Sequence, residues 1–362
     1  MPLVLILSFY ASLIKSLLAL GFARLYTPQH IPGRDLTGQT AIITGANSGI
    51  GLSMAVALAQ QGASVCLACR DPDRGTAAVE YVLSQCPCSS SASIYTRALD
   101  VGNLESVRSF CRAWEEQAAG PAIDMLVHNA GIASPPREFH LLDQERAALI
   151  YRTNFLGSFL MTRLLETHLT PGARVVMTSS TGSYSAASYF LGRPSRNTTP
   201  VTPGLLSRMV ARVRYALNIK KGAAAPYALT KAQQILFAQL LQRRFDALAG
   251  FGNRCTAHAF TPGFASTPIF GKLDMNWRTW VSDPLFALLK VTEKWLAVPV
   301  QEGAKTGVWL ASHGDVLGSR GKGGSYWERM TKRTSVADVM DEGRKKEEWE
   351  GWERDAGAIQ VA

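Results

Sequence analysis

From Ala41 onward, the chain alternates short apolar runs with longer stretches whose apolar residues recur at helical spacing. We interpret as strands the short runs Ala41–Thr44, Ser64–Ala68, Ser93–Leu99, Met125–His128, Arg174–Thr178 and Cys255–Phe260. We interpret as helices the stretches Ile50–Gln61, Pro72–Ser84, Asn103–Ala118, Gln144–His168 and Pro226–Leu248. Strand–helix repetition with short links produces parallel β-α-β units. We therefore predict an α/β fold, a Rossmann-like doubly wound parallel sheet with helices on both faces.

A single domain with three additions accounts for the length of the chain. Its 362 residues, 47% of them hydrophobic, provide for a sizeable core and exclude wholesale disorder. We place the domain at residues 37–330, with no internal repeat and no second domain. The additions are an apolar segment (1–26), a basic insertion (185–225) and a charged C-terminal tail (331–362). The six cysteines show no metal-ligand spacing, so we expect no metal site.

Positive charge is concentrated in the insertion. The formal net charge is +10, and residues 185–225 contain seven bases and no acid. Such charge suits nucleic acid, anionic lipid or a phosphorylated cofactor. Aromatic residues are not interleaved with the bases and no nucleic-acid motif is present, so we predict no nucleic-acid partner. Residues 205–217 have an apolar helical side, which would suit either a lipid surface beside the site or a solvated helix packed on the domain.

The first 26 residues form an apolar segment about as long as a membrane-spanning helix. Lys15 near its middle is costly in hydrocarbon, so a tilted span, an interfacial helix and a signal peptide all remain open. We favour a retained membrane anchor. The expected location is the endoplasmic reticulum or a lipid droplet with the catalytic domain facing the cytosol, and the alternative is a cytoplasmic protein.

The first predicted strand runs into the glycine-rich turn Thr44-Gly45-Ala46-Asn47-Ser48-Gly49-Ile50-Gly51. Glycines between a strand and a helix allow a tight turn and a close approach to a pyrophosphate, which the helix N-terminus attracts. We assign cofactor binding here to Gly45, Asn47, Ser48, Gly49, Ile50 and Gly51. The placement after the first strand makes this a dinucleotide-binding loop.

The end of the second predicted strand bears on the choice of nicotinamide cofactor. In this position an acidic residue would accept from the ribose 2′-hydroxyl, whereas an arginine would pair with a 2′-phosphate. Arg70 follows the strand, and Asp71 before Pro72 is typical of a helix cap. We therefore favour NADP(H) over NAD(H). Asp100, after the third strand, could contact the adenine edge or serve only as a turn residue.

Tyr227 and Lys231 open a predicted helix, and their i, i+4 spacing places both side chains on one face. A free tyrosine has a pKa near 10, too high for acid–base work at neutral pH. A neighbouring ammonium and an oxidised nicotinamide ring would both favour the phenolate and lower that pKa. We predict Tyr227 as the catalytic acid–base and Lys231 as its partner.

The complete set of motifs resembles the short-chain dehydrogenase/reductase family. The set comprises Thr-Gly-x-x-x-Gly-x-Gly, the sequence Asn129-Ala130-Gly131, a serine after the fifth strand and Tyr-x-x-x-Lys. The Ala-Cys-Arg-Asp run and the apolar leader resemble its retinol-dehydrogenase-like branch, fungal relatives included. The resemblance covers roughly residues 37–312. The separation of Ser180 from Tyr227 is longer than is usual in this family, because of the insertion.

The resemblance implies further site residues. Ser180 would stabilise charge on the substrate oxygen, with Ser179 and Ser183 as lesser candidates. Asn154 would hold a water in a proton relay, and Lys231 would also bind the nicotinamide ribose. The cofactor-binding residues implied outside the glycine turn are Asn129, Ala130, Gly131, Pro262, Gly263 and Thr267.

These inferences predict an NADP(H)-dependent oxidoreductase that acts on CH–OH donors with NAD(P)+ as acceptor. The expected substrate is lipophilic: a retinoid, a sterol, a fatty-chain carbonyl or a secondary metabolite. The tryptophan-rich stretch 269–298 would suit such a ligand. The rival interpretation is a membrane-bound NADP-binding interaction or sensor protein without turnover. The oligomeric state stays open, a homo-oligomer included.

Overall fold

Eight strands form one sheet in the part of the chain that the computed structural model describes, which comprises residues 3–86, 93–117, 122–134, 141–191, 224–248, 255–266, 291, 295–313 and 323–357. The strand order is β3-β2-β1-β4-β5-β6-β7-β8, and only β8 is antiparallel to its neighbour. The strands are β1 (Thr40–Thr44), β2 (Ser64–Cys69), β3 (Ile94–Ala98), β4 (Ile123–His128), β5 (Leu169–Thr178), β6 (Thr256–Thr261), β7 (Ser325–Glu328) and β8 (Thr331–Arg333). The predicted fold class is confirmed.

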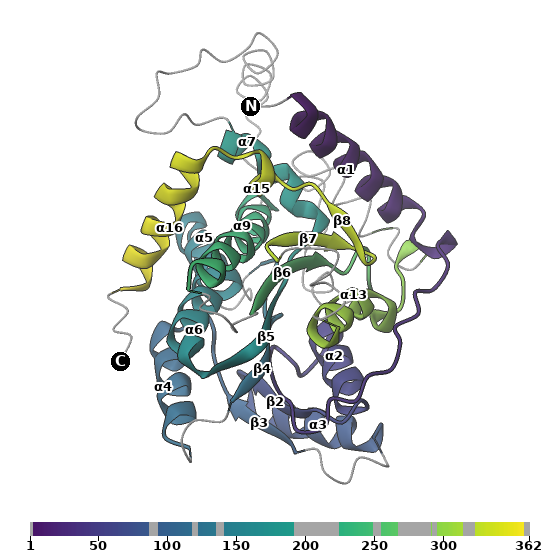
Figure 1. Cartoon of the computed structure of the whole chain (residues 1–362), viewed down its shortest axis with the longest axis vertical. Helices are drawn as coiled ribbons and strands as arrows, with labels where there is room; N and C mark the ends of the chain where they lie inside the picture. Colours follow the sequence, from purple (N-terminus) through teal and green to yellow (C-terminus); the bar gives the residue numbers. More distant parts are fainter. Residues whose placement is uncertain are drawn as a thin grey trace.

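Helices cover both faces of this sheet (Figure 1). One face packs against α2 (Gly49–Ala59), α3 (Pro72–Ser84) and α13 (Val300–Ser312). The other packs against α4 (Leu104–Glu115), α5 (Asp143–Tyr151), α6 (Gly157–Leu165) and α9 (Ala224–Leu248). Successive residues of β1 show why both faces are apolar: Ile42 points into one core, and Ala41 and Ile43 point into the other.

The remaining elements complete the described structure. They are α1 (Leu3–Gly21), η1 (Ala23–Leu25), the π turn η3 (Arg152–Leu156), η4 (Glu166–His168), η5 (Thr181–Ala186), α7 (Ala187–Leu191), α15 (Val336–Val339) and α16 (Glu342–Ala356). The predicted helix Gln144–His168 is thus divided by a π turn, and β5 begins five residues before its predicted start. Most of the basic insertion, including its predicted helix, lies outside the described residues.

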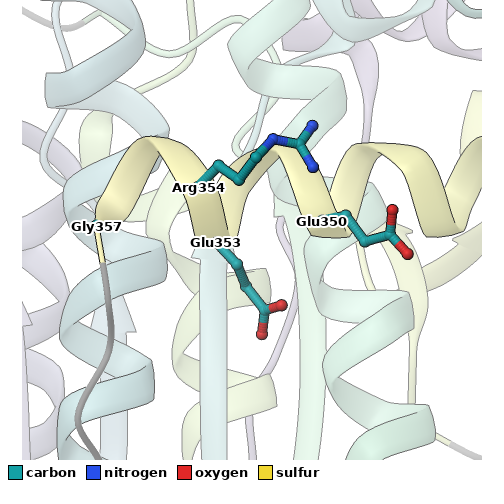
Figure 2. A pocket seen from close by; sticks show the side chains of 4 residues that line it. All are labelled: Glu350, Glu353, Arg354 and Gly357. Atoms are coloured by element: carbon teal, nitrogen blue, oxygen red, sulfur yellow. The ribbon is translucent and has the colours of Figure 1, made fainter.

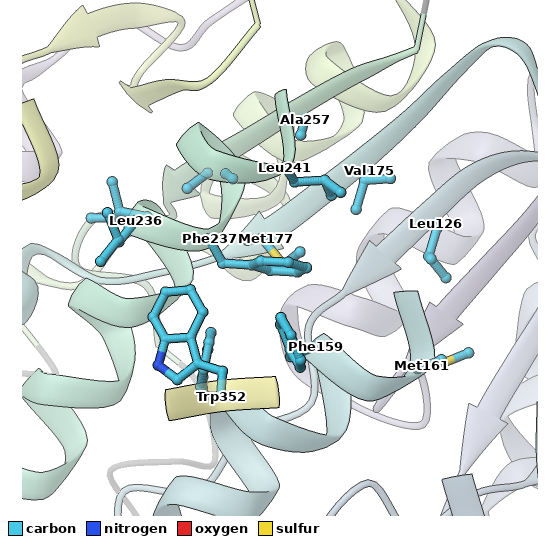
Figure 3. Packing of buried hydrophobic residues seen from close by; sticks show 14 of the residues in the cluster. Leu126, Phe159, Met161, Val175, Met177, Leu236, Phe237, Leu241, Ala257 and Trp352 are labelled. Carbon is cyan, nitrogen blue, oxygen red and sulfur yellow. The ribbon is translucent and has the colours of Figure 1, made fainter. Parts of the chain in front are cut away.

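Residues 331–356 of the predicted charged tail are built into the domain. The boundary at residue 330 falls inside the β7–β8 hairpin, and α16 packs across α6 and α9 (Figure 1). Charged residues dominate the sequence of α16, yet Trp352 is only 2% exposed. Its ring lies 4.6 Å from that of Phe155 and 5.9 Å from that of Phe159, and Figure 3 shows it among the core side chains. This segment therefore packs as part of the domain, which its charged composition did not indicate.

Helix α1 lies along the domain beside α15 and η5 (Figure 1). Its inner face buries Phe9, whose ring lies 5.4 Å from that of Tyr184. Its outer face exposes large apolar side chains, namely Val4, Leu7, Tyr10, Ile14, Leu17 and Leu18. Among the described helices α1 alone has the length and composition to cross a bilayer, properties that signal sequences and core helices share.

Replacing Trp352 by Ala should destabilise the protein by about 3–5 kcal/mol, because it removes a buried aromatic ring and leaves a cavity. The matched change is Trp295→Ala, since Trp295 is 68% exposed. That variant should stay within about 0.5 kcal/mol of the wild type. Denaturant unfolding of both variants measures the difference, and equal losses would contradict the packed position of α16.

Candidate active site

The glycine turn brings β1 and β4 into close backbone contact at their carboxyl ends. Gly45 has a φ of +64°, and a Cβ built on it would lie 2.9 Å from the Cα of Ala130. A Cβ on Gly51 would lie 2.4 Å from Nδ2 of Asn129. Both positions therefore require glycine, the first for conformation and space and the second for space alone.

Thr44 and Asn129 tie the two strand ends together. The Thr44 hydroxyl accepts hydrogen bonds from the backbone N–H of Asn129 at 3.0 Å and of Ala130 at 3.1 Å. In return, Nδ2 of Asn129 donates to the carbonyls of Thr44 and Gly45, each at 3.2 Å. This clamp fixes the path of the chain on both sides of the turn.

Helix α2 begins at Gly49, directly after the turn, and its N-terminus suits an anion. Ser48 precedes it in an extended conformation and its side chain makes no capping hydrogen bond, while the first turn contains no acidic residue. Asn47 and Ser48 lie in the turn, and Ile50 packs into the core. The N–H groups and dipole of α2 thus face the turn without a competing carboxylate. These features, with the close glycine contacts, fit a dinucleotide pyrophosphate.

The strand ends beside this turn carry the other predicted nucleotide contacts. Arg70 is exposed directly after β2, and Asp71 caps α3 by accepting from the Arg74 N–H at 3.1 Å. Asp100 follows β3, and its Oδ1 accepts from the Gly102 N–H at 2.9 Å. The structure thus gives Asp71 and Asp100 local turn or cap contacts and leaves Arg70 as the cation at the tip of β2.

Tyr227 and Lys231 lie on the first turns of α9, with the Lys231 Nζ 5.5 Å from the tyrosine ring centre. Burial raises the pKa of Tyr227 to about 12, and a hydrogen bond with Ser180 partly opposes the shift. Burial lowers the pKa of Lys231 to about 7. The expected lowering of the tyrosine pKa is therefore not seen in the protein alone, because loss of water around the phenol outweighs other influences.

The three candidate serines have different surroundings. Ser180 follows β5, hydrogen-bonds with Tyr227 and accepts from the Gly182 N–H at 3.1 Å. The Ser179 hydroxyl instead donates to the Lys231 carbonyl at 2.7 Å, and Ser183 is buried in η5. Ser180 is thus the serine that meets the tyrosine.

Asn154 lies in the π turn η3, a distortion that is frequent at functional sites. Its Oδ1 accepts from the Ile132 N–H at 2.7 Å. Its Nδ2 donates to the Ile132 carbonyl at 2.9 Å and to the Thr230 hydroxyl at 3.2 Å. A Cβ on Gly131 would lie 3.3 Å from Oδ1 of Asn154 and 3.4 Å from Nζ of Lys231. The loop after β4, the π turn and α9 therefore meet at one point.

The loop after β6 borders the same region. The N–H groups of Thr181 and Gly263 both donate to the Thr261 hydroxyl at 3.1 Å, which joins the Pro262–Gly263 turn to η5. Phe264 is buried and packs with Leu20, so it is a core residue. Thr267 lies outside the described residues.

A separate surface hollow lies on α16, lined by Glu350, Glu353, Arg354 and Gly357 (Figure 2). None of these four residues comes from the strand ends that carry the predicted site. The described ranges also contain no group of three or more His, Cys, Asp or Glu side chains able to hold a metal ion. The predicted site residues described above lie instead at the carboxyl ends of β1 to β6, in η3 and at the start of α9.

Two site contacts were missed from the sequence. The Lys231 Nζ donates to the Thr178 carbonyl at 2.7 Å and to Oε1 of Gln234 at 3.2 Å. The spacing of Gln234, three residues after Lys231, would have placed both on one helix face. Nothing in the sequence distinguishes the Thr178 carbonyl.

Comparison with known proteins gives the same class of protein. The family model for short chain dehydrogenases matches residues 39–190. Dehydrogenase/reductase SDR family member 13 of Homo sapiens is 34% identical over 69% of this chain, and the match spans 58% of that relative. The WW domain-containing oxidoreductase of Gallus gallus is 30% identical over 90% of this chain and 69% of its own length. Human retinol dehydrogenase 14 is 28% identical over 86% of this chain and 84% of its own length.

Solved structures show the same fold. An uncharacterised protein from Mycobacterium Paratuberculosis has a TM-score of 0.57 and 25% identity over 91% of this chain and 98% of its own. L-sorbose reductase from Gluconobacter frateurii was solved with NADPH and L-sorbose. It has a TM-score of 0.55 and 19% identity over 82% of this chain and 96% of its own.

The fold and the glycine-lined strand ends are those of a nicotinamide-binding class of oxidoreductases. The chain belongs to the short-chain dehydrogenase/reductase family, in its retinol-dehydrogenase-like branch.

The contact between Gly45 and Ala130 gives a test of the nucleotide site. Gly45→Ala should weaken NADPH binding at least tenfold, because the new Cβ meets the Ala130 backbone. Gly38→Ala is the matched control, since Gly38 also has positive φ, +80°, but nothing lies within 4 Å of its Cβ position. Both changes share the strain of about 1–2 kcal/mol for a left-handed residue. NADPH binding is measured by quenching of protein fluorescence. If both variants lost the same amount of NADPH affinity, the nucleotide site would not lie at this turn.

Proposed function

We propose that this protein is an NADP(H)-dependent oxidoreductase that interconverts a carbonyl and an alcohol on a lipophilic substrate. The observation that carries the proposal is the meeting of Tyr227, Ser180 and Lys231 at the strand ends beside the glycine turn. These residues offer a proton donor, a hydroxyl for the substrate oxygen and a cation at one place.

The protein's own groups would manage the proton and the oxygen charge. A bound nicotinamide would supply or accept the hydride. Tyr227, with its pKa raised to about 12 by burial, holds its proton at neutral pH and can give it to a developing alkoxide. Ser180 can donate to the same oxygen and so stabilise its charge. Lys231 would favour the phenolate left behind, through its positive charge.

Arg70 supports the choice of NADP(H). It is exposed at the tip of β2, where the adenosine ribose of a dinucleotide lies in this fold. The neighbouring acid, Asp71, accepts the Arg74 N–H through Oδ1, which is the role typical of an acid that precedes a helix. The Arg70 guanidinium suits a 2′-phosphate.

Two features support a lipophilic substrate. The relatives include retinol dehydrogenases, and this chain presents apolar surface along α1. We propose a retinoid, a sterol, a fatty-chain carbonyl or a secondary metabolite as the substrate class.

Tyr227→Phe should lower the rate of carbonyl reduction by about 10²–10⁴-fold, because the substrate oxygen loses its proton donor. Tyr81→Phe is the matched control, since Tyr81 is exposed on α3. Oxidation of NADPH and of NADH is followed with a panel of lipophilic ketones and aldehydes. The wild type should use NADPH better than NADH. A wild type that binds NADPH but turns over no carbonyl would favour the sensor interpretation, and an active Tyr227→Phe variant would exclude this mechanism.

We also propose that α1 binds a membrane while it stays docked on the domain. Three serines on its inner face hydrogen-bond to the β7–β8 region: Ser8 to the Thr334 hydroxyl at 2.6 Å, Ser12 to the Thr334 N–H at 3.0 Å and Ser16 to Glu328 at 2.7 Å. Glu328 is buried, so a helix that left to span the bilayer would uncover a carboxylate and the surface around Tyr184. The apolar outer face is thus left to lie in the plane of the lipid surface.

Replacing Leu7 and Ile14 together by Glu should lower binding to phosphatidylcholine–phosphatidylserine vesicles at least tenfold, since each exposed aliphatic side chain contributes about 1.5–3 kcal/mol when buried. Leu248→Glu is the matched control, an exposed leucine on α9. A disulfide between Ser8→Cys and Thr334→Cys would tie α1 to the domain. This tied protein should still bind vesicles, and its failure to bind would show that α1 must leave the domain.

A further inference from the structure

Gln234 joins the catalytic lysine to the asparagine of the π turn. It lies one turn after Lys231 on α9 and is fully buried. Its Oε1 accepts from the Lys231 Nζ at 3.2 Å, while its Nε2 donates to the Asn154 backbone carbonyl at 2.7 Å. Both ends of one amide are thus used between two elements of the candidate site.

The surroundings of Lys231 make the contact with Gln234 important. Its Nζ has two hydrogen-bond acceptors among the described residues, the Thr178 carbonyl of β5 and Oε1 of Gln234, and both are neutral. From α9 itself the titratable Tyr227 faces it, while the loop after β4 and the π turn present uncharged Gly131 and Asn154. Burial lowers the pKa of Lys231 to about 7, with no carboxylate contributing. The charged form therefore depends on these two oxygens.

Asn154 is correspondingly committed to other partners. Both hydrogens of its side-chain amide are donated within the protein, one to Ile132 and one to Thr230, and its backbone carbonyl accepts from Gln234. From the sequence, Asn154 was expected to hold a water in a proton relay. In the described structure the Gln234 amide links the Asn154 backbone carbonyl directly to the Lys231 ammonium.

We propose that Gln234 is a positioning residue of the active site, which holds the Lys231 ammonium through its side-chain carbonyl and ties it to the Asn154 backbone carbonyl through its side-chain N–H. The catalytic part of this inference rests on the proposed oxidoreductase function. The contact itself can be tested in the protein without cofactor or substrate.

Two variants should move the titration of Lys231 in opposite directions. Gln234→Met keeps the length of the side chain but removes the acceptor, so the pKa of Lys231 should fall. Gln234→Glu places a carboxylate beside the ammonium, so that pKa should rise. Activity that needs the ammonium is lost as the pH rises through this pKa. The alkaline limb of the kcat profile should therefore move to lower pH in Gln234→Met, with kcat about 10–100-fold lower, and to higher pH in Gln234→Glu.

The matched control is Gln233→Met, which removes a neighbouring buried glutamine and should leave the titration of Lys231 unchanged. Heteronuclear NMR titration of the Lys231 side chain in the free protein gives the pKa, and circular dichroism with thermal unfolding checks the fold. If Gln234→Glu is the only variant that folds, the upward shift of the Lys231 pKa in that variant is the deciding result. Opposite shifts support the proposal even if no carbonyl substrate is turned over. An unchanged Lys231 titration in a folded Gln234 variant would overturn it, whatever the activity.

Discussion

The hydroxyl of Thr44 is the contact on which the candidate site depends. By accepting from two successive N–H groups, those of Asn129 and Ala130, it holds the end of β1 against the end of β4. That close approach excludes a side chain at Gly45 and sets the direction in which the chain continues to Gly131. Gly131 then lies next to both Lys231 and Asn154. The Thr44 hydroxyl thus fixes the position of the glycine turn relative to the region of Lys231 and Asn154.

Burial dominates the electrostatics of the pair that follows. It raises the pKa of Tyr227 and lowers that of Lys231, so both shifts favour the uncharged forms. Neutral oxygens from Thr178 and Gln234 are what support the ammonium. A site of this kind responds strongly to any charge or hydrogen bond that a ligand adds, because little solvent screening opposes it.

The sequence predicted strands β1 to β6 because buried parallel strands and amphipathic helices leave periodic patterns, but it missed the short hairpin of β7 and β8. Arg70 at the tip of β2 and Ser180 after β5 were placed by the same logic. The π turn at Asn154 is a backbone distortion that the spacing of apolar residues did not indicate. The contact from Gln234 to the Asn154 carbonyl and the burial of Trp352 against Phe155 join residues that are far apart in the sequence, and no local pattern records such contacts. Thr267 and the predicted helix of the basic insertion lie beyond the described part of the chain.

The serine-lined inner face of α1 has a practical consequence for handling the protein. Removing the first 26 residues to obtain a soluble form would take away part of the wall around Glu328 and Tyr184, together with the polar partners of Thr334. The trimmed protein would expose fresh apolar and acidic surface at the place where the sheet ends. Replacing the exposed leucines of α1 by polar residues would leave these contacts intact. Changing the outer face of α1 therefore suits crystallisation better than removing the helix.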